Sequence, residues 1–282
     1  IAKDILWFHA AIWPAMLLAL RKQDGFDWVS LPGVLYVHSF WIAEGQKMSK
    51  SLGNFIDLEK IDQYVETFGL DALRWFLATQ GPMGTTDSDF AEARFIETYN
   101  SELANTVGNC LNRVSNMLSR YFDGRIAETR LDADLIYKKA SPAGATTSHT
   151  WTEVIRSECE TAGYVLARCM SEKFLSIAAI AGVELIRRLD TYLEKTQPFK
   201  LAKNESTRPP VATILRIASV LLWPFMPAKA EEIWRRLGCD YAEQMKANGG
   251  RGKLDEWVKW GQLKPGTPIA QGEPLFPRYQ VK

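Results

Sequence analysis

The sequence predicts a mostly α-helical protein with a small α/β part near its N-terminal end. Apolar side chains recur at spacings of three and four over most of the chain after residue 57, which is the period of amphipathic helices. The short run VLYV at residues 34–37 is instead apolar and rich in β-formers, which is typical of a buried parallel strand. These two patterns place strands early in the chain and helices after them.

The composition is that of a globular protein. Of the 282 residues, 46% are hydrophobic and 24% are charged, which supplies a sizeable core and excludes disorder as the main state. Lys and Arg number 34 against 33 Asp and Glu, so the net charge of +1 excludes a surface that is basic all over but leaves room for a local nucleic-acid site. No apolar run approaches the roughly 18 residues that span a bilayer. We therefore expect no membrane partner and a cytoplasmic location.

The use of cysteine in the sequence also favours a cytoplasmic protein. The four cysteines are widely spaced and form no C-x-x-C pair, which argues against a disulfide framework and against a zinc knuckle. We expect reduced thiols and no metal site in this chain. The cysteines are Cys110, Cys159, Cys169 and Cys239.

The N-terminal segment is expected to be a helix followed by strands. Residues 1–20 carry apolar side chains at helical spacing, and Pro14 within them predicts a kink or a late first turn. A loop over 25–33 follows, then the strand 34–37 and a second short strand over 40–42. The chain opens in an apolar stretch without an initial Met, as in the middle of a domain, so we expect it to be a piece of a longer protein.

Acidic residues mark the predicted helix starts that follow. Asp57 suits an N-cap, and Gly69 is suited to end the helix that it starts. Asp71 is expected to cap the next helix, and Asp87 and Asp89 to lead into another.

The rest of the chain is predicted to be helical up to a tail. One amphipathic helix of about 30 residues, about 45 Å long, is expected over 95–121. Segment 141–150 is expected to be a connector, and 254–282, which is dense in Gly and Pro, an extended tail. Further helices are expected near 151–170, 174–195, 211–223 and 228–237.

The segment most specific for chemistry is KMSKS at residues 47–51, followed by LGN. Two lysines flank small hydroxyl residues in a polar loop that follows a strand and precedes a helix. Lysine is a flexible point charge for phosphate, and glycines at 45 and 53 let the backbone bend towards a ligand. The residues alone allow either a loop that stabilises negative charge on a phosphoryl group or a solvated polar loop.

The full string resembles the KMSKS signature of the class I aminoacyl-tRNA synthetases, including the trailing Ser-x-Gly-Asn, and GLDALR at 69–74 is similar to their G-x-D-A-L-R element. The resemblance implies a loop that closes on ATP, which is bound with Mg²⁺. Lys47 and Lys50 then stabilise the transition state as the amino-acid carboxylate attacks the α-phosphate and pyrophosphate leaves. Met48, Ser49 and Ser51 complete this ATP-binding loop.

Other segments resemble the methionyl branch of this family, the first being KDI at 3–5 with FH at 8–9 and WPAM at 13–16. The resemblance implies that Asp4 helps to hold the substrates, and that Ile5 and His9 help to line a methionine pocket. A thioether needs an apolar, polarizable pocket of this kind. Ala2 stands where the family usually has Gly. Without the resemblance, His9 would be read as a histidine satisfied within an apolar core.

The next two segments lie in the helical part. Asn109 and Arg113 are four apart, so they share one helix face and offer hydrogen bonds to base edges. In the family the matching residues read the CAU anticodon, which implies tRNA(Met) as a partner; the alternative for Arg113 is an ordinary solvated side chain. Phe199 replaces the usual Trp and still presents a face on which an anticodon base can stack. Its alternative role is to plug the end of a helix.

The resemblance divides the chain into four parts. They are the C-terminal portion of a Rossmann-type catalytic domain over 1–46, a KMSKS and stem-contact connector over 47–92, a helical anticodon-binding domain over 93–240, and an extended tail over 241–282 that packs back on the core.

The second signature of class I synthetases, the HIGH-type motif, is absent from this sequence. The three histidines, His9, His38 and His149, stand in no H-x-G-H context. We therefore expect a methionine–tRNA ligase segment that is inactive without the N-terminal half of the same enzyme, which would also carry any zinc. A stand-alone RNA-binding module, or a class I synthetase for leucine, isoleucine, valine or cysteine, are the alternatives.

Overall fold

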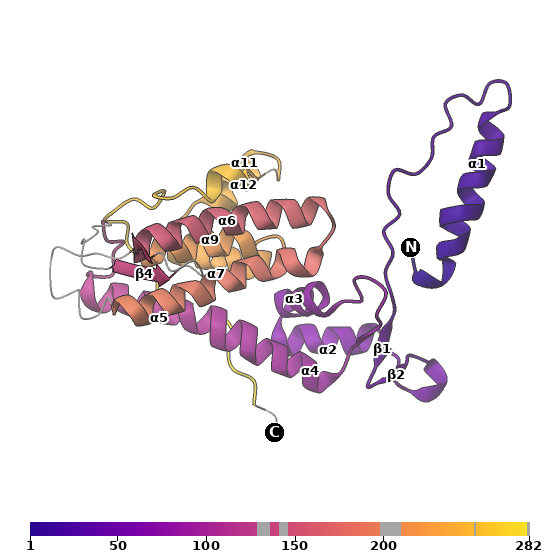
Figure 1. The fold of residues 1–282 in the computed structure, drawn as a ribbon. Helices are drawn as coiled ribbons and strands as arrows, with labels where there is room; N and C mark the ends of the chain where they lie inside the picture. The colour runs from indigo at the N-terminus through magenta and orange to yellow at the C-terminus, as the bar shows by residue number, and fades with distance from the viewer. Residues whose placement is uncertain (129–135, 141–145, 198–209, 251, 281–282) are drawn as a thin grey trace.

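The computed structural model describes residues 1–128, 136–140, 146–197, 210–250 and 252–280. Residues 1–40 form an N-terminal arm that is set apart from a helical bundle (Figure 1). The arm begins with a 3₁₀ turn, Lys3–Ile5, and a π-helical turn, Phe8–Ile12, which lead into α1, Trp13–Arg21. Pro14 is the second residue of α1, which continues from the π-helical turn before it. Of the two outcomes expected for this proline, the structure has the late first turn.

The strand predicted over 34–37 is wrong. The segment has no strand pairing, and its neighbour His38 makes only an isolated parallel bridge to Ala2. Val34 is 78% exposed. The run is apolar and β-prone, but among the described residues no neighbouring strand covers it, so its propensity has no sheet to act in.

Apolar side chains are exposed along the whole arm. Trp7 is 70% and Trp28 76% exposed, although tryptophan is a residue that proteins usually bury. Other large apolar side chains exposed here are Ile5, Leu6, Phe8, Ile12, Trp13, Met16, Leu18, Leu20, Phe26, Leu31, Tyr36 and Phe40. So large a contiguous apolar surface marks an interaction face.

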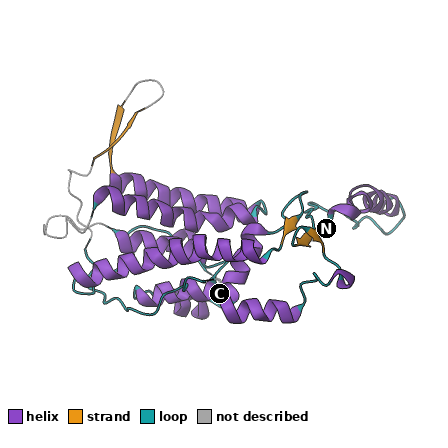
Figure 2. Cartoon of the chain, turned by 90° about the horizontal axis from the view of Figure 1, so that it is seen from below, coloured by secondary structure: helices purple, strands orange, loops and turns teal. Residues whose placement is uncertain are grey.

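A small three-stranded sheet joins the arm to the rest of the molecule. β1, Trp41–Ala43, pairs antiparallel with β2, Gln46–Lys47, and parallel with β3, Ser88–Asp89. The strand predicted over 40–42 is thus confirmed, one residue later. Glu44 and Gly45 both have positive φ, 51° and 75°, as a two-residue hairpin turn of the primed type requires. Figure 2 shows these short strands beside the N-terminus.

Two helices follow the sheet. α2, Leu58–Phe68, starts at Asp57, whose Oδ1 accepts a bond from the N–H of Lys60 at 2.9 Å, and it ends at Gly69 with φ +87°. Both features were predicted. α3, Leu70–Gln80, packs beside α2.

The other acidic caps were predicted wrongly. Asp71 does not cap α3; its Oδ2 accepts a bond from the N–H of Lys229, at the start of a distant helix. Asp87 and Asp89 do not cap α4, Glu92–Thr98, because the N–H of Glu92 donates instead to the Glu44 carboxylate at 3.0 Å. A carboxylate binds whichever N–H the tertiary fold brings to it, and sequence proximity does not decide this.

The predicted long helix is continuous but not uniform. α4 runs into a π-helical segment, Tyr99–Gly108, and then into α5, Asn109–Tyr121. The junction residues keep helical angles, so the chain does not turn between the three pieces.

The bundle is built on three more helices, α6, Trp151–Ser171, α7, Leu175–Thr196, and α9, Val211–Leu222. α7 packs against both α6 and α9, and every residue of α9 is buried. α10, Pro227–Arg236, follows. All four lie within one residue of their predicted bounds. The connector predicted over 141–150 is wrong in part, because β5, Thr146–Thr150, pairs antiparallel with β4, Ile136–Ala140.

The tail lies along the bundle and starts with two short helices. These are α11, Tyr241–Ala247, and α12, Leu254–Trp257 (Figure 1). The fully buried Arg216 of α9 holds them: its Nη2 donates to the carbonyl of Lys259 at 2.5 Å, and its Nη1 donates to the Tyr241 hydroxyl and the Trp257 carbonyl. Further along, the Tyr99 hydroxyl donates to the carbonyl of Pro277 at 2.8 Å.

Candidate functional site

The signature loop, residues 47–51, leaves the sheet at its edge. Lys47 ends β2, and Lys50 begins a 3₁₀ turn, Lys50–Leu52, that closes at Gly53 with φ +67°. Both lysine side chains are exposed, whereas Met48 packs against the core. The loop is therefore anchored by its second residue and presents its charges to solvent.

Asn54 fixes the shape of the signature loop. Its Oδ1 accepts a bond from the N–H of Ser49 at 2.9 Å. Its Nδ2 donates to the carbonyls of Lys47 at 3.1 Å and Ala43 at 3.4 Å. One side chain thus ties the loop to both strands of the hairpin. The sequence showed this residue at the end of the signature, but its clamping role depends on contacts that only the fold reveals.

The two lysines of the loop are free to act as phosphate ligands. Within the described part of the chain, neither forms an ion pair. Lys50 Nζ lies 5.8 Å from the centre of the Phe55 ring, a weak cation–π contact at an exposed site. The Ser49 and Ser51 hydroxyls lie 2.7 Å apart in hydrogen-bonding contact. Two exposed cations beside two hydroxyls suit an anionic ligand.

The predicted methionine-pocket residues lie together at the base of the N-terminal arm. His9 Nδ1 lies 3.0 Å from the carbonyl oxygen of Ile5, and its ring meets Trp13 edge-on with centroids 6.1 Å apart. Asp4 and Ile5 are exposed and His9 is half-buried. Among the described residues no contact joins this group to the signature loop.

A polar network attaches the arm to the sheet, and apart from the charged residues themselves no sequence pattern predicts it. Asp87 Oδ1 accepts bonds from Lys3 Nζ at 2.7 Å and from the N–H of Phe40 at 3.0 Å, and it also accepts from the Ser39 hydroxyl. The bond from Lys3 is the main reason that the pKa of Asp87 is lowered to about 2. Lys3 directly precedes Asp4, so the bond from Lys3 to the Asp87 carboxylate orients the start of the predicted methionine pocket.

The second candidate site lies on α5. Asn109 and Arg113 are both exposed, one helical turn apart. Arg113 Nη1 pairs with Asp190 Oδ1 of α7 at 2.5 Å. Burial raises the pKa of Asp190, and the charge of Arg113 opposes that rise. The pair holds the guanidinium at the edge of the bundle.

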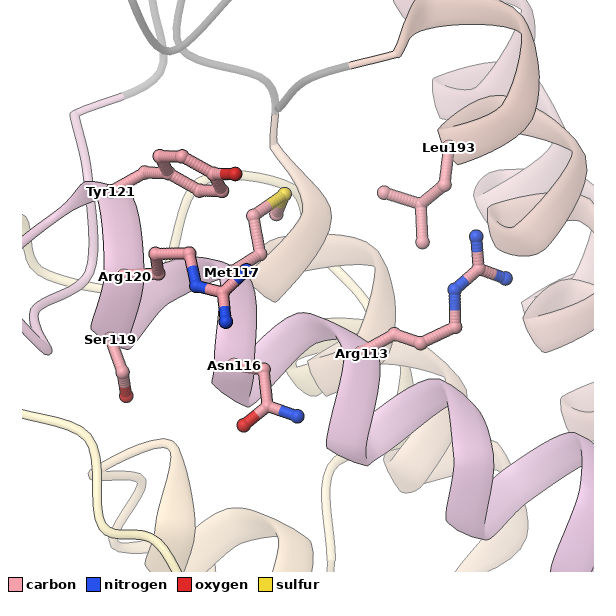
Figure 3. Close-up of a pocket in the computed structure, with 7 residues that line it drawn as sticks. All are labelled: Arg113, Asn116, Met117, Ser119, Arg120, Tyr121 and Leu193. Atoms are coloured by element: carbon pink, nitrogen blue, oxygen red, sulfur yellow. The ribbon is translucent and has the colours of Figure 1, made fainter. Parts of the chain in front are cut away.

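Arg113 also borders a cavity of about 690 Å³ between α5 and α7. Figure 3 shows the side chains that line it, with Leu193 coming from α7 and the others from α5. They are Arg113, Asn116, Met117, Ser119, Arg120, Tyr121 and Leu193. Phe199, predicted to serve the same site, lies outside the described residues.

A profile of the family described as "tRNA synthetases class I (M)" matches residues 1–115. The chain is also 35% identical over 298 residues to the methionine–tRNA ligase of Halalkalibacterium halodurans, and the match covers 100% of this chain and 39% of that protein. Over its whole length the chain is similar to the class I methionyl-tRNA synthetases. The ligase of Bacillus subtilis strain 168 is 34% identical over 291 residues and is covered to 38%. The chain thus spans about two fifths of the length of these relatives.

A solved member of the family has the same fold. The Mycobacterium tuberculosis methionyl-tRNA synthetase in complex with methionyl-adenylate matches with a TM-score of 0.70 at 28% identity, over 99% of this chain and 49% of that one. The match confirms the fold class predicted here, an α/β part followed by a helical bundle.

Two kinds of feature are absent from the described residues. No helix among them is long and apolar enough to cross a membrane. They also contain no group of three or more His, Cys, Asp or Glu side chains that could hold a metal ion.

Proposed function

We propose that this chain is part of a methionine–tRNA ligase, in which residues 47–51 act on ATP and the helical bundle reads the CAU anticodon of tRNA(Met). The similarity of the whole chain to proteins of that name carries the proposal. The clamped signature loop with its two unpaired lysines supports it.

The proposal includes the four parts expected from the sequence, with bounds 1–46, 47–92, 93–240 and 241–282. The exposed apolar face of the arm supports a catalytic domain completed by more polypeptide, since Trp7 and Trp28 stay uncovered otherwise. The partner that fits is the N-terminal half of the same enzyme, and a cytoplasmic location belongs to the same proposal.

The chemistry assigned to the signature loop is charge stabilisation in two-step aminoacyl transfer. The methionine carboxylate attacks the α-phosphate of ATP, and the bond to the leaving pyrophosphate breaks. Lys47 and Lys50 stabilise the negative charge that builds up on the phosphate oxygens. A terminal ribose hydroxyl of the tRNA then attacks the methionyl carbonyl, and AMP leaves. Lys50 needs only to leave the Phe55 ring to reach a phosphate, because that contact is weak.

Asp4, Ile5 and His9 are proposed to form one wall of the methionine pocket. The Ile5 side chain supplies apolar surface, and the contact of His9 with the Ile5 carbonyl fixes the turn on which both sit. Mg²⁺ is proposed to arrive with ATP. The described residues offer it no cluster of ligands, so no step is assigned to the ion in this chain.

The bundle is proposed to read the anticodon through Asn109, Arg113 and Phe199. For the first two, their shared exposed face and the fixed guanidinium of Arg113 support the assignment. An arginine whose position is set by a carboxylate loses less conformational entropy when it pairs with a base edge.

Filter binding of the chain to tRNA with a CAU anticodon, compared with tRNAs carrying substituted anticodons, tests this function. We expect a preference for CAU, and we expect Asn109→Ala and Arg113→Ala to lose it. Arg168→Gln, an exposed arginine of α6 paired with Glu172, is the matched control and should keep the preference. A preference for a different anticodon would favour another class I synthetase, and equal binding to all anticodons would favour a general RNA-binding module.

A steady-state aminoacylation assay tests the role of the missing half. We expect no turnover from this chain alone, because it has no H-x-G-H motif to bind ATP from the other side. Turnover by the 282-residue chain would show that it needs no further polypeptide.

A further inference from the structure

The cavity next to Arg113 contains groups that the anticodon assignment does not use. Arg120 and Asn116 are exposed, and within the described part of the chain neither side chain has a hydrogen-bond or ionic partner. Arg113, by contrast, is already paired with Asp190. α5 carries no acidic residue over Asn109–Tyr121. The Arg120 guanidinium is therefore the uncompensated positive charge of this part of the helix.

The cavity combines an apolar floor with a polar rim. Met117 and Leu193 are buried and form the floor. Tyr121 is 37% exposed at the far end, and Figure 3 shows its ring and the Arg120 side chain on the same side of the cavity. Ser119 is held in place by a bond from Gln271 Nε2 of the tail at 2.7 Å. A volume of about 690 Å³ lies within the range of ligand sites.

The position of the cavity relates it to the predicted RNA-reading residues. Asn109, Arg113, Asn116 and Arg120 follow one another at spacings of four, three and four, so they form one stripe along the exposed face of α5. A single-stranded nucleic acid that contacts the first two residues would reach the cavity by continuing along this stripe. An aromatic ring beside a cation is the combination that takes an unpaired base and its phosphate.

We propose that this cavity takes one unpaired nucleotide of the tRNA anticodon loop, beside the bases read by Asn109 and Arg113. The Tyr121 ring stacks on the base, the Arg120 guanidinium pairs with the phosphate, and Asn116 lines the cavity between them. The inference rests on the proposed function and extends it by one nucleotide subsite. It assigns these residues to affinity and not to the discrimination between anticodons, because stacking and phosphate pairing read no base edge.

Fluorescence anisotropy of a stem–loop RNA with the anticodon CAU, bound to the 282-residue chain, tests the subsite. Arg120→Gln should weaken binding about 5- to 10-fold, equally for CAU and substituted anticodons, and should lower the slope of log affinity against log salt by about 0.7. Tyr121→Ala should weaken binding by at least about 5-fold, as loss of one stacked base does, whereas Tyr121→Phe should stay within about 2-fold of the wild type. Arg168→Gln is the control for general loss of positive charge.

The outcomes separate this inference from the function beneath it. If the wild type prefers CAU and Asn109→Ala loses that preference, but Arg120→Gln and Tyr121→Ala bind like the wild type, the subsite is overturned and the proposed function stands. The subsite is also overturned if Arg168→Gln lowers the RNA affinity as much as Arg120→Gln does. If the wild type shows no anticodon preference at all, both are overturned. Because the substituted side chains are exposed, circular dichroism should show all variants folded.

Discussion

The carboxylate of Asp71 in α3 accepts a hydrogen bond at 2.6 Å from the backbone N–H of Lys229, the third residue of α10. Two elements 158 positions apart in the chain are thus joined by a helix cap that neither segment could supply alone. Arg74 of the same α3 donates to the carbonyls of Pro224 and Phe225 at 2.9 and 3.0 Å, just before α10. The segment GLDALR therefore fixes the signature-bearing part of the chain to the bundle.

Replacing Asp71 should destabilise the chain. Asp71→Ala leaves a buried N–H of α10 without its acceptor, which should lower the free energy of unfolding by about 1–3 kcal/mol. Asp71→Asn keeps an acceptor oxygen and should cost less. Urea unfolding measures both, with Asp62→Ala, an exposed position on α2, as the control. Equal midpoints for Asp71→Ala and the control would show that the cap carries no stability.

The attachment of the arm should be acid-labile. The pKa of Asp87 is lowered from 3.8 to about 2, chiefly by the bond from Lys3. Because the folded state has the lower pKa, the carboxylate stabilises it fully above pH 3.8, and this contribution is lost as the pH falls towards 2. The stability difference between the wild type and Asp87→Asn should therefore shrink over that window.

The cause of the shift is separately testable. In Lys3→Met, carbon-13 NMR of the carboxyl groups should show the pKa of Asp87 rising towards 3.8. Lys253→Met, which removes a partner of Glu256 in the tail, should leave Asp87 unchanged. If the pKa of Asp87 were the same in Lys3→Met as in the wild type, the hydrogen bonds from Ser39 and Phe40 alone would account for its lowered pKa.

Loss of Asn54 should loosen the signature loop. Asn54→Ala removes the acceptor for the Ser49 N–H and the donor to two carbonyls of the hairpin, so trypsin should cut after Lys47 and Lys50 faster. Since each lost bond is worth about 1 kcal/mol, the rate should rise roughly 5-fold or more. Mass spectrometry of timed digests gives the rates. Asn248→Ala, at an exposed position in the tail, should leave them unchanged.

Neutralising Asp190 should separate RNA affinity from anticodon discrimination. Asp190→Asn removes a negative charge from the rim of the α5 site and releases Arg113 from its 2.5 Å pair. We expect tighter binding to every anticodon at low salt, with a smaller preference for CAU, because the guanidinium keeps its charge but loses its fixed direction. Filter binding at two salt concentrations measures both. An unchanged preference would mean that the ion pair does not orient Arg113 for reading.

Local patterns predicted the helices well because each carries its own information. α6, α7, α9 and α10 have apolar stripes of helical period, and their bounds follow from these. The strand expected over 34–37 failed because a strand needs a neighbour, and the sequence of one segment cannot provide it. The cap from Asp71 and the network around Asp87 escaped prediction for the same reason: their partners are distant in the chain.

In the candidate sites, too, the local sequence predicted some features, while others depend on partners that only the fold brings close. The signature string located the loop, yet nothing in it showed that Asn54 would bind the Ser49 backbone. The spacing of Asn109 and Arg113 placed them correctly on one exposed face, while the Asp190 partner came only with the fold. Their roles, and those of Asp4, Ile5, His9, Lys47 and Lys50, stay predictions.

The π-helical segment Tyr99–Gly108 lies immediately before Asn109. A π turn holds more residues than an α turn. It therefore affects the direction, about the helix axis, in which the side chains that follow it point. In a helix of unchanged winding, the loss of one residue turns the downstream face by about 100°, whereas a π turn can absorb one extra residue locally. The wide winding of Tyr99–Gly108 therefore sets the direction in which Asn109 and Arg113 face.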